Sequence, residues 1–335
     1  MRYAVVLGEA LVDLLDGRHD GEPVYRQMIG GAPLNVAVGV VRLGGAVEFV
    51  GSLGDDVLAG RIRDFLDGVG VGQRGVVTAP VPTALAVVTY AGAEPDFRFY
   101  GEPPSYGLLQ ASALDVSLIE DAAVLYCGSI ALLCPPVLDA ARRAWSLASG
   151  LRVFDPNVRP RLLAGPAALD ELRTVVAEFA ATAHLVKLSA GDAEMLYPGA
   201  SVGEVAARLR ALGAGTVVVT RGAQGALVAS AAGTIQLDSP PVRAVDATGA
   251  GDSVMAALIA DLLADGQPTD QVGWRKRVAF ALRVAAVVAE SPGGAVAMPT
   301  RAEVARRFGP PTNRPTPAGS PVPDRCDHVS PVSSA

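Results

Sequence analysis

The sequence predicts an α/β fold in which a doubly wound, mainly parallel sheet is flanked by helices and accompanied by a smaller β-sheet. Half of the 335 residues are apolar and 19% are charged, which is enough apolar material for a large buried core. Short runs rich in Val, Leu and Ile alternate with helical stretches along the chain. Strands that are apolar on both faces and separated by helices are typical of a parallel sheet covered on both sides.

The elements of the main sheet follow this alternation in order. Its strands are expected at Ala4–Gly8, Val47–Gly51, Val124–Cys127, Leu151–Phe154, His184–Lys187 and Thr216–Thr220. Helices are expected at Asn35–Leu43, Val57–Val69, Pro136–Ser149, Ala167–Ala180 and Val202–Leu212. The Asp55–Asp56 pair stands where the second of these helices needs an N-terminal cap.

A second group of strands lacks crossover helices. It comprises Leu11–Leu15, Val24–Ile29, Leu85–Tyr90 and Phe97–Tyr100. Their hairpin-like connections predict a small sheet projecting from the main one, formed by residues of about 11–30 and 83–110 within one domain over residues 1–308. Residues 309–335 carry seven of the 25 prolines and few large apolar side chains, so we expect a disordered tail, with a docking motif as the less favoured alternative.

Composition also limits the classes of partner. The formal net charge of −6 argues against a general nucleic-acid or anionic-membrane binder. Glu9 and Asp13 interrupt the N-terminal apolar stretch, which is therefore not typical of a signal peptide. Cys127, Cys134 and Cys326 have neither disulfide-framework nor zinc spacing. We expect a cytoplasmic globular protein without nucleic-acid or membrane partners.

Lysine usage excludes two kinds of phosphate-handling protein. The chain has only two lysines, Lys187 and Lys276, and neither follows a glycine, so there is no Gly-Lys-Ser/Thr P-loop. Neither lies in a VAIK-like strand, which excludes a protein kinase. A phosphate site in this chain would have to be built from backbone amides.

The stretch DATGAGDSVMAALIADLLA provides such a site. Gly249, Ala250 and Gly251 form a small-residue turn that leads directly into an apolar helix. Backbone N–H groups converge at such a turn and the helix dipole adds positive charge, so an anion fits there. Asp252 would stand in the first helical turn, where it can accept a proton from an attacking hydroxyl. The alternative is that Asp252 is only a helix-start residue favoured by the dipole.

A second stretch, GGAPLNVAVGVVRLGG, is suited to a hydroxyl-rich ligand. Gly30 and Gly31 permit close approach of a ligand to the backbone, and Asn35 offers both a donor and an acceptor. Alternatively, this is a glycine loop that Asn35 caps. Asp13 stands between apolar neighbours at a strand end, where its carboxylate either holds sugar hydroxyls or faces solvent.

Together these stretches resemble the ribokinase-like (PfkB) carbohydrate kinase family. The GG-x-P-x-N stretch at Gly30–Asn35, with Gly44 and Gly54, resembles the family's N-terminal signature, and DATGAGD at Asp246–Asp252 resembles its C-terminal signature. The order and separation of the two also match. The resemblance implies a doubly wound α/β domain with a β-sheet lid that phosphorylates a sugar hydroxyl with ATP.

The resemblance also implies roles for individual residues. Asp252 matches the catalytic base, and the Gly249–Gly251 turn, Ala250 included, matches the anion hole. Sugar-binding positions are matched by Asp13, Gly30, Gly31 and Asn35, and positions near the nucleotide by Thr220, Gly222 and Gly225. Asp246 and Thr248 resemble part of a monovalent-cation site, with K⁺ as the expected ion. In relatives the lid can also serve as a dimerisation surface, so a homodimer through the lid is expected.

Within the family, the middle of the chain looks most like bacterial fructokinases. The stretch VFDPNVRP places Arg159 where it helps to hold phosphate, or forms a surface ion pair instead. HLVKLSAGDAEML places Lys187 near ATP, or at a strand end that it caps. DFRFYGEPPSYGLL resembles the lid strand and loop before the sugar, and Tyr100 is its candidate substrate contact.

Four features depart from the family pattern, among them Ala247 and the stretch Glu290–Gly294, which lacks the basic residue common in relatives. Ala190 stands where relatives usually carry an acidic residue that organises magnesium, with Asp192 and Glu194 nearby. Mg²⁺ is then expected to be held mainly by ATP phosphates and water. Gly101 stands where fructokinases commonly have arginine.

The expected reaction is in-line transfer of the γ-phosphoryl group of ATP to a sugar hydroxyl, with a ketohexose as the favoured acceptor. Other acceptors of the family, such as ribose or 2-keto-3-deoxygluconate, remain open. So does a nucleoside kinase, because Tyr100 and Tyr106 can stack a base. A non-catalytic sugar-binding regulator is permitted by Ala190. A dinucleotide-binding oxidoreductase is disfavoured, because only Gly8 follows the first strand.

Overall fold

The computed structural model describes residues 2–91, 94–133, 135–291 and 293–309, and its main feature is a nine-stranded sheet. The strand order is β13-β12-β11-β10-β9-β8-β1-β4-β5. Neighbours from β11 to β5 run parallel, whereas β12 and β13 form an antiparallel edge. The strands are β1 (Ala4–Leu7), β4 (Val47–Leu53), β5 (Gly72–Thr78), β8 (Val124–Gly128), β9 (Leu151–Asp155), β10 (Leu185–Ser189), β11 (Thr216–Thr220), β12 (Ala226–Ser230) and β13 (Gly233–Leu237).

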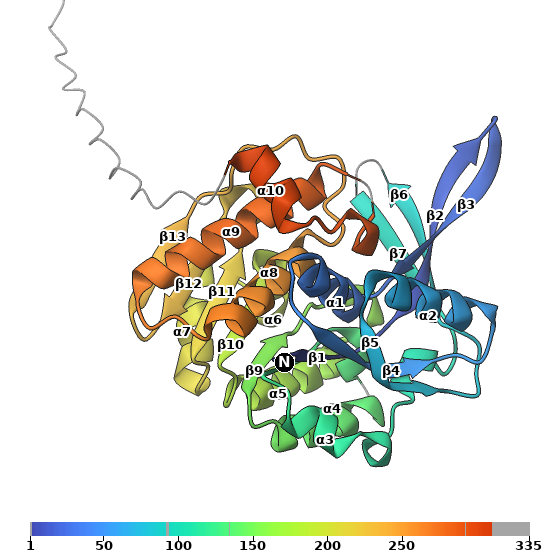
Figure 1. The fold of residues 1–335 in the computed structure, drawn as a ribbon, viewed down its shortest axis with the longest axis horizontal. Helices are drawn as coiled ribbons and strands as arrows, with labels where there is room; N and C mark the ends of the chain where they lie inside the picture. Colours follow the sequence, from blue (N-terminus) through green and yellow to red (C-terminus); the bar gives the residue numbers. More distant parts are fainter. Residues whose placement is uncertain (1, 92–93, 134, 292, 310–335) are drawn as a thin grey trace, which may run out of the picture.

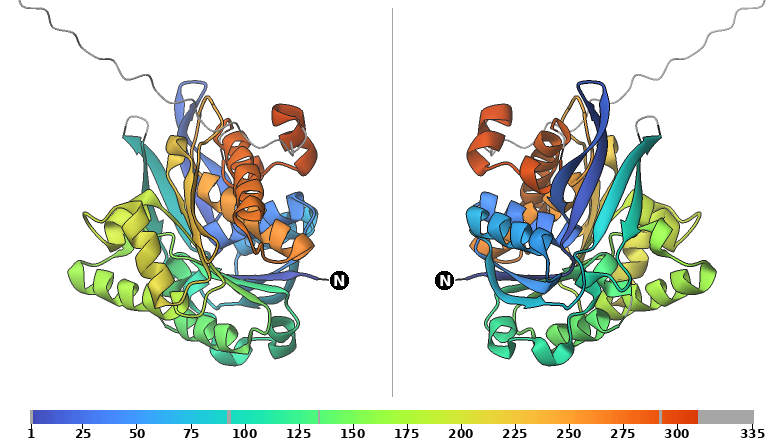
Figure 2. Two further views of the ribbon diagram at one scale, coloured as in Figure 1. Left: turned by 90° about the vertical axis from the view of Figure 1, so that its left-hand side faces the viewer. Right: turned by 90° about the vertical axis from the view of Figure 1, so that its right-hand side faces the viewer.

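Helices cover both faces of this sheet (Figures 1 and 2). One face carries α1 (Ala32–Arg42), α2 (Val57–Val69), α8 (Ala250–Asp265), α9 (Gln271–Ala289) and α10 (Arg301–Phe308). The other carries α3 (Val116–Glu120), α4 (Val137–Leu147), α5 (Pro166–Ala180), α6 (Ala190–Leu196) and α7 (Val202–Leu212). Along β1, Ala4 and Val6 enter the first core while Val5 and Leu7 enter the second. The doubly wound architecture is therefore confirmed.

The best-predicted helices are those with strong sequence signals at their ends. Asp56 caps α2 by accepting hydrogen bonds from the amides of Leu58 and Ala59, both at 3.0 Å, and the left-handed Gly70 ends the helix. Ser201 and Glu204 form a capping box at the start of α7. Both helices begin and end at the predicted residues.

The smaller sheet projects from the main one as a lid (Figure 1). Its order is β3-β2-β6-β7, with β2 (Leu11–His19), β3 (Glu22–Gly30), β6 (Leu85–Ala91) and β7 (Glu94–Tyr100). The pair β2–β3 is an antiparallel hairpin, whereas β2 and β6 run parallel. The second lid segment was expected to extend to about residue 110. Instead, Tyr106 and Leu109 are buried in the main core, so the lid strands end at Tyr100.

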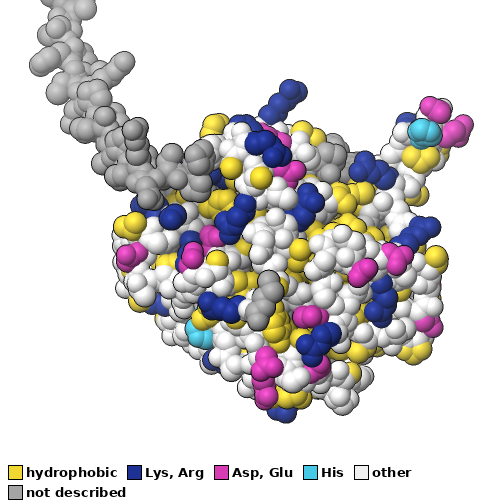
Figure 3. All heavy atoms as spheres, in the orientation of Figure 1, with side chains coloured by type: hydrophobic (Ala, Val, Ile, Leu, Met, Phe, Trp, Pro, Cys, Tyr) yellow, Lys and Arg dark blue, Asp and Glu magenta, His cyan; other side chains and the backbone are white. Residues whose placement is uncertain are grey.

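Several elements were not among the expected ones: β5, the β12–β13 hairpin and the helices α3, α6, α9 and α10. The expected tail falls outside the described residues from residue 310 onward. On the face seen in Figure 3, acidic and basic side chains are interspersed and do not form a field of one sign. Among the described helices, none combines the length and the apolar character that crossing a bilayer requires.

Candidate active site

A cavity of about 980 Å³ lies between the lid and the carboxyl ends of the central strands. Glu9 reaches it from the end of β1, Asn157 follows β9, and Lys187 lies on β10. The loop before α8 and residues from the lid complete the lining. Ligands of open α/β sheets bind at this edge, because the loops after parallel strands meet there.

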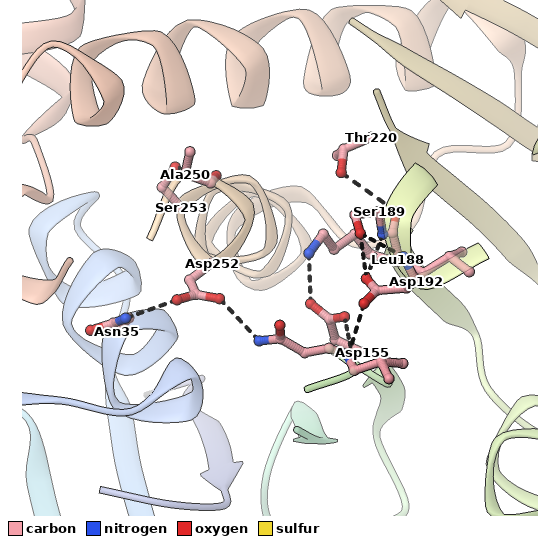
Figure 4. Close-up of polar contacts among 12 residues, drawn as sticks. Asn35, Asp155, Leu188, Ser189, Asp192, Thr220, Ala250, Asp252 and Ser253 are labelled. Atoms are coloured by element: carbon pink, nitrogen blue, oxygen red, sulfur yellow. Dashed lines mark hydrogen bonds and ion pairs between the residues drawn. The ribbon is translucent and has the colours of Figure 1, made fainter. Parts of the chain in front are cut away.

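Asp252 lies in the first turn of α8 and is 6% exposed. Its Oδ2 accepts a hydrogen bond from Asn35 Nδ2 at 2.8 Å, and its Oδ1 accepts one from Asn157 Nδ2 at 3.3 Å (Figure 4). Asn35 lies on α1, so α1 and the loop after β9 hold the two carboxylate oxygens from different sides. The orientation of the carboxylate is thereby fixed.

The start of α8 offers an anion site beside Asp252. Among the described residues, the amides of Gly249, Gly251 and Asp252 donate to no protein acceptor, as first-turn amides do when nothing caps them. Ala250 differs, because its amide donates to the Ala247 carbonyl at 3.1 Å. The free amides of this turn can therefore bind an anion, and that of Ala250 is already engaged.

Gly249 gives the turn its shape. Its φ of +79° is in the left-handed region, and an added Cβ would lie 2.9 Å from the Gly294 Cα. Both the backbone conformation and the close approach therefore require glycine.

Lys187 lies deep beneath this turn. Its Nζ forms an ion pair with Asp155 Oδ2 at 2.8 Å, and the two side chains are 3% and 0% exposed. Burial raises the pKa of Asp155 to about 6, although the Lys187 charge opposes this shift. Burial acts to lower the pKa of Lys187, but the carboxylates of Asp155 and Asp192 outweigh it, so the pKa is raised. The ammonium group is therefore a buried structural cation that also lines the cavity.

The Asp192 carboxylate accepts hydrogen bonds from nearby residues through both of its oxygens. Its Oδ2 accepts hydrogen bonds from the amide and hydroxyl of Ser189 in a capping box, and its Oδ1 accepts one from the Val158 amide at 2.8 Å. Glu194 accepts from the Gly199 amide. Within the described ranges, no three His, Cys, Asp or Glu side chains are grouped so as to hold a metal ion. Both carboxylates near Ala190 thus have hydrogen-bond donors of the protein beside them.

The predicted sugar-binding residues come together at the lid side of the cavity. Asp13, Gly31 and Asn35 line it, and Gly30 lines a small recess that Asp13 and Asn35 share. A Cβ on Gly30 would lie 2.2 Å from Asp13 Oδ2, and one on Gly31 would lie 2.6 Å from the Glu9 carbonyl oxygen. Burial raises the pKa of Asp13 to about 7, and the Arg159 charge opposes this shift.

Of the two other residues expected to contact substrate, Arg159 lies at the cavity and Tyr100 does not. Arg159 lines the cavity, and its Nη1 donates to the side-chain Oδ1 of Asn157. Tyr100 is 54% exposed and lies outside the lining, whereas Phe97 and Phe99 of the same strand line the cavity. The aromatic side chains that the lid contributes to the cavity are thus Phe97 and Phe99, not the expected Tyr100 of the same strand.

The residues expected at the nucleotide lie outside the cavity lining, at the end of β11. Thr220 is paired in register with Ser189. Gly222 and Gly225 have φ of +56° and +82°; Gly222 begins the short helix η5 (Gly222–Gln224) and Gly225 follows it. This places the three residues one strand away from Ser189, which does line the cavity.

Asp246 and Thr248 line the cavity in the loop before α8. Asp246 Oδ1 accepts a hydrogen bond from the Thr248 amide at 2.8 Å, and its Oδ2 accepts one from the Gly293 amide at 3.3 Å. Val245 and Asp246 also donate from their amides to the Ala289 carbonyl. The two backbone amides therefore hold the loop to the end of α9, and the carboxylate holds it to the segment that follows α9.

Sequence reasoning missed three polar residues of this site. Glu9 is 1% exposed and accepts hydrogen bonds from the amides of Ala32 and Ala131, both at 3.3 Å; burial raises its pKa to about 7. Asp155 and Asn157 were the other two. The available signal was position, because each of the three lies at, or within two residues of, the carboxyl end of an apolar strand that meets this edge of the sheet.

Comparison with known proteins decides the family. The profile of the pfkB family carbohydrate kinases matches residues 1–301. The chain belongs to this family. It is 36% identical over 311 residues to fructokinase-1 of Oryza sativa, covering 90% of this chain and 95% of that protein. It is 34% identical over 307 residues to the fructokinase of Klebsiella pneumoniae, covering 90% and 97%.

A solved structure agrees with these relatives. The fructokinase of Vibrio cholerae O395 bound to fructose, ADP and calcium superposes with a TM-score of 0.82 at 28% identity, covering 91% of this chain and 98% of that one. The resemblance noted in the sequence and the ribokinase-like fold are confirmed. The chain is an ATP-dependent carbohydrate kinase.

Proposed function

We propose that this carbohydrate kinase phosphorylates fructose, with Asp252 as the catalytic base. The observation that carries the proposal is the placement of Asp252, whose two oxygens are fixed beside the free amides of Gly249 and Gly251. The relatives named above are fructokinases, and one of them was solved with fructose and ADP bound. The first feature supports transfer of a phosphoryl group to a hydroxyl, and the second supports a ketohexose as the acceptor.

The sugar is expected between the lid and α1. The Asp13 carboxylate and the backbone at Gly30 and Gly31 offer acceptors and close approach to sugar hydroxyls. Asn35 uses its Nδ2 on Asp252, but its Oδ1 is buried and has no hydrogen-bond partner among the described residues. A sugar hydroxyl would satisfy this acceptor. Phe97 and Phe99 would cover the sugar and exclude water.

The transfer needs one base and an anion site. Asp252 accepts the proton of the sugar hydroxyl while the new O–P bond forms to the γ-phosphorus. The bond from the γ-phosphorus to the bridging oxygen breaks, and that oxygen leaves with ADP. The amides of Gly249 and Gly251 stabilise negative charge on the transferred group, and we assign Ala250 to the geometry of the turn. Positioning and charge stabilisation suffice for this class of reaction.

The nucleotide is expected beyond the anion site, toward the end of β11. Thr220, Gly222 and Gly225 form its far wall in this proposal, Arg159 contributes positive charge at the cavity, and Lys187 supports the floor. Tyr100 is assigned to the outer edge of the lid. Magnesium, when bound, would neutralise part of the negative charge of the ATP phosphates. It is expected to be held by phosphates and water, since the carboxylates of Asp155 and Asp192 are engaged.

A monovalent cation is proposed at the loop of Asp246 and Thr248, which the carboxylate of Asp246 holds beside the anion site. Replacing K⁺ by tetramethylammonium at constant ionic strength is expected to lower kcat. Equal rates in the two salts would contradict a cation site.

A homodimer through the lid is proposed because Tyr25 is 58% exposed on β3. Sedimentation of Tyr25→Glu should show a smaller species than the unmodified protein.

The test of the function is ADP release with ATP and magnesium against fructose, tagatose, ribose, 2-keto-3-deoxygluconate, inositol and adenosine. We expect fructose to give the highest kcat/KM. A preference for adenosine would favour the nucleoside kinase, and sugar binding without ADP release would favour the non-catalytic regulator.

Asp252→Asn is the critical variant, and Asp265→Asn at the other end of α8 is its matched control. Asp265 is 74% exposed, so its loss should leave turnover unchanged. Asp252→Asn is expected to lower kcat by about 10² to 10⁴. If both variants turned over equally well, Asp252 would not be the base.

A further inference from the structure

We propose that Asn157 is a positioning residue that fixes the Asp252 carboxylate in its reactive orientation. The inference rests on the proposed function, because it assigns Asn157 to the base of that reaction. Asn157 lies 95 positions from Asp252 in the chain, yet its Nδ2 is 3.3 Å from Asp252 Oδ1. This oxygen is the one that Asn35 does not bind.

The orientation of the Asn157 amide is determined by its neighbours. Arg159 Nη1 donates to Asn157 Oδ1. A guanidinium has donors only, so the oxygen of the amide must face Arg159 and the NH₂ group must face the opposite side. Asp252, an acceptor, lies on that side. Arg159 therefore determines which end of the Asn157 side chain meets the base.

The backbone of Asn157 is held as firmly as its side chain. Its amide donates to Asp155 Oδ1 at 3.1 Å, and its φ of +38° is a left-handed conformation that asparagine adopts more readily than most residues. Asp155 in turn uses Oδ2 for the buried ion pair with Lys187. A continuous series of contacts thus runs from Lys187 through Asp155 and Asn157 to Asp252 (Figure 4).

These contacts restrict one specific motion. A carboxylate turns easily about its last side-chain bond, because that torsion has a broad energy profile. With Asn35 on one oxygen and Asn157 on the other, the Asp252 carboxylate cannot turn without losing a hydrogen bond. Loss of Asn157 should let the carboxylate rotate out of line with the attacking hydroxyl, which lowers the rate without removing any contact to the sugar.

Two variants test this role. Asn157→Gly removes the amide but suits the left-handed backbone, so the loop should keep its shape. Asn157→Asp keeps the shape and can still accept from Arg159, but presents a carboxylate oxygen to Asp252 instead of a donor. We expect both to lower kcat by about 10- to 100-fold, with Asn157→Asp at least as impaired, and to change the KM for the sugar by less than about threefold.

A double-mutant cycle with Asp252→Asn separates positioning from general damage. If Asn157 acts through the Asp252 carboxylate, Asn157→Gly should change the residual rate of Asp252→Asn by less than about twofold. An equal loss in both backgrounds would overturn the inference. So would near-normal turnover of Asn157→Asp, or an increase in KM with kcat unchanged.

A crystal structure of Asn157→Gly gives a readout that needs no acceptor. We expect the Asp252 carboxylate to be rotated away from the position in which Asn35 binds Oδ2. An unchanged carboxylate would overturn the inference. Because this measurement does not depend on turnover, it decides the role of Asn157 even if the unmodified protein phosphorylated none of the acceptors, an outcome that would refute the proposed function instead.

Discussion

Replacing Lys187 by methionine should destabilise the protein strongly. The Lys187–Asp155 pair is 2.8 Å long, and its side chains are 3% and 0% exposed. Methionine fills a similar volume but leaves the Asp155 carboxylate buried without its cation. Removing one partner of a buried ion pair costs about 3–5 kcal/mol, because the remaining charge is neither hydrated nor paired.

The expected loss can be expressed as a melting temperature. At about 2.1 cal/mol/K per residue, the folded part of this chain unfolds with an entropy near 0.65 kcal/mol/K. A loss of 3–5 kcal/mol then lowers Tm by about 5–8 °C. Arg142→Met is the matched control. The Arg142–Glu178 pair has the same 2.8 Å distance, but its side chains are 40% and 44% exposed. Its loss should cost no more than about 1 kcal/mol.

The effect of Lys187→Met should also depend on pH. Burial already raises the pKa of Asp155 to about 6 with Lys187 present, and without the cation the rise should be larger. A carboxyl group with a raised pKa binds more protons in the folded state, so folding becomes less favourable as pH rises above the unfolded value. Urea unfolding at pH 5 and pH 8 should therefore show the larger loss at pH 8. A larger loss at pH 5, or one equal to that of Arg142→Met at both values, would refute this reasoning.

Three further substitutions follow from the geometry. Gly249 has a φ of +79°, and Gly249→Ala places a Cβ 2.9 Å from the backbone of the loop after α9. Both Tm in thermal unfolding and kcat should therefore fall. Gly30→Ala places a Cβ 2.2 Å from Asp13 Oδ2, and steady-state kinetics should show an increased KM for the sugar, with the KM for ATP as internal control. Asp56→Ala removes two amide contacts at the start of α2 and should cost about 1–2 kcal/mol in urea unfolding, whereas Asp55→Ala should cost little.

Local signals explain how much of the fold could be predicted. The helix α2 was predicted at its true bounds, and Asp56, one of the two residues expected to cap it, does so. The edge strand β5, by contrast, reads GQRGVVT, and its polar residues hide it from a search for apolar runs. The strands β12 and β13 pair antiparallel at the other edge. No helix connects them, so the alternation of strands and helices in the sequence does not reveal this hairpin. Edge strands are thus the part of this sheet that periodicity describes least well.

Prediction of the site has a different limit. The signatures pointed to Asp252, Asn35 and Asp13, and the structure brings these residues to one cavity. The contact between Asn157 and Asp252 joins residues far apart in the chain, and no local pattern encodes it. Lys187, which was expected near ATP, lines the cavity, and its ion pair with Asp155 depends on the register of β9 and β10.

Two connections of the lid to the rest of the molecule are very short. Gly31 alone separates β3 from α1, and three residues separate β1 from β2. An extended residue spans only about 3.3–3.6 Å, so these connections allow the lid to tilt by small amounts but do not act as flexible linkers. Asp13 lies on the lid side of the Gly31 joint and Asn35 on the core side. Any tilt of the lid therefore changes the separation of these two residues directly. The angle of the lid thus determines how large a sugar can contact both of them.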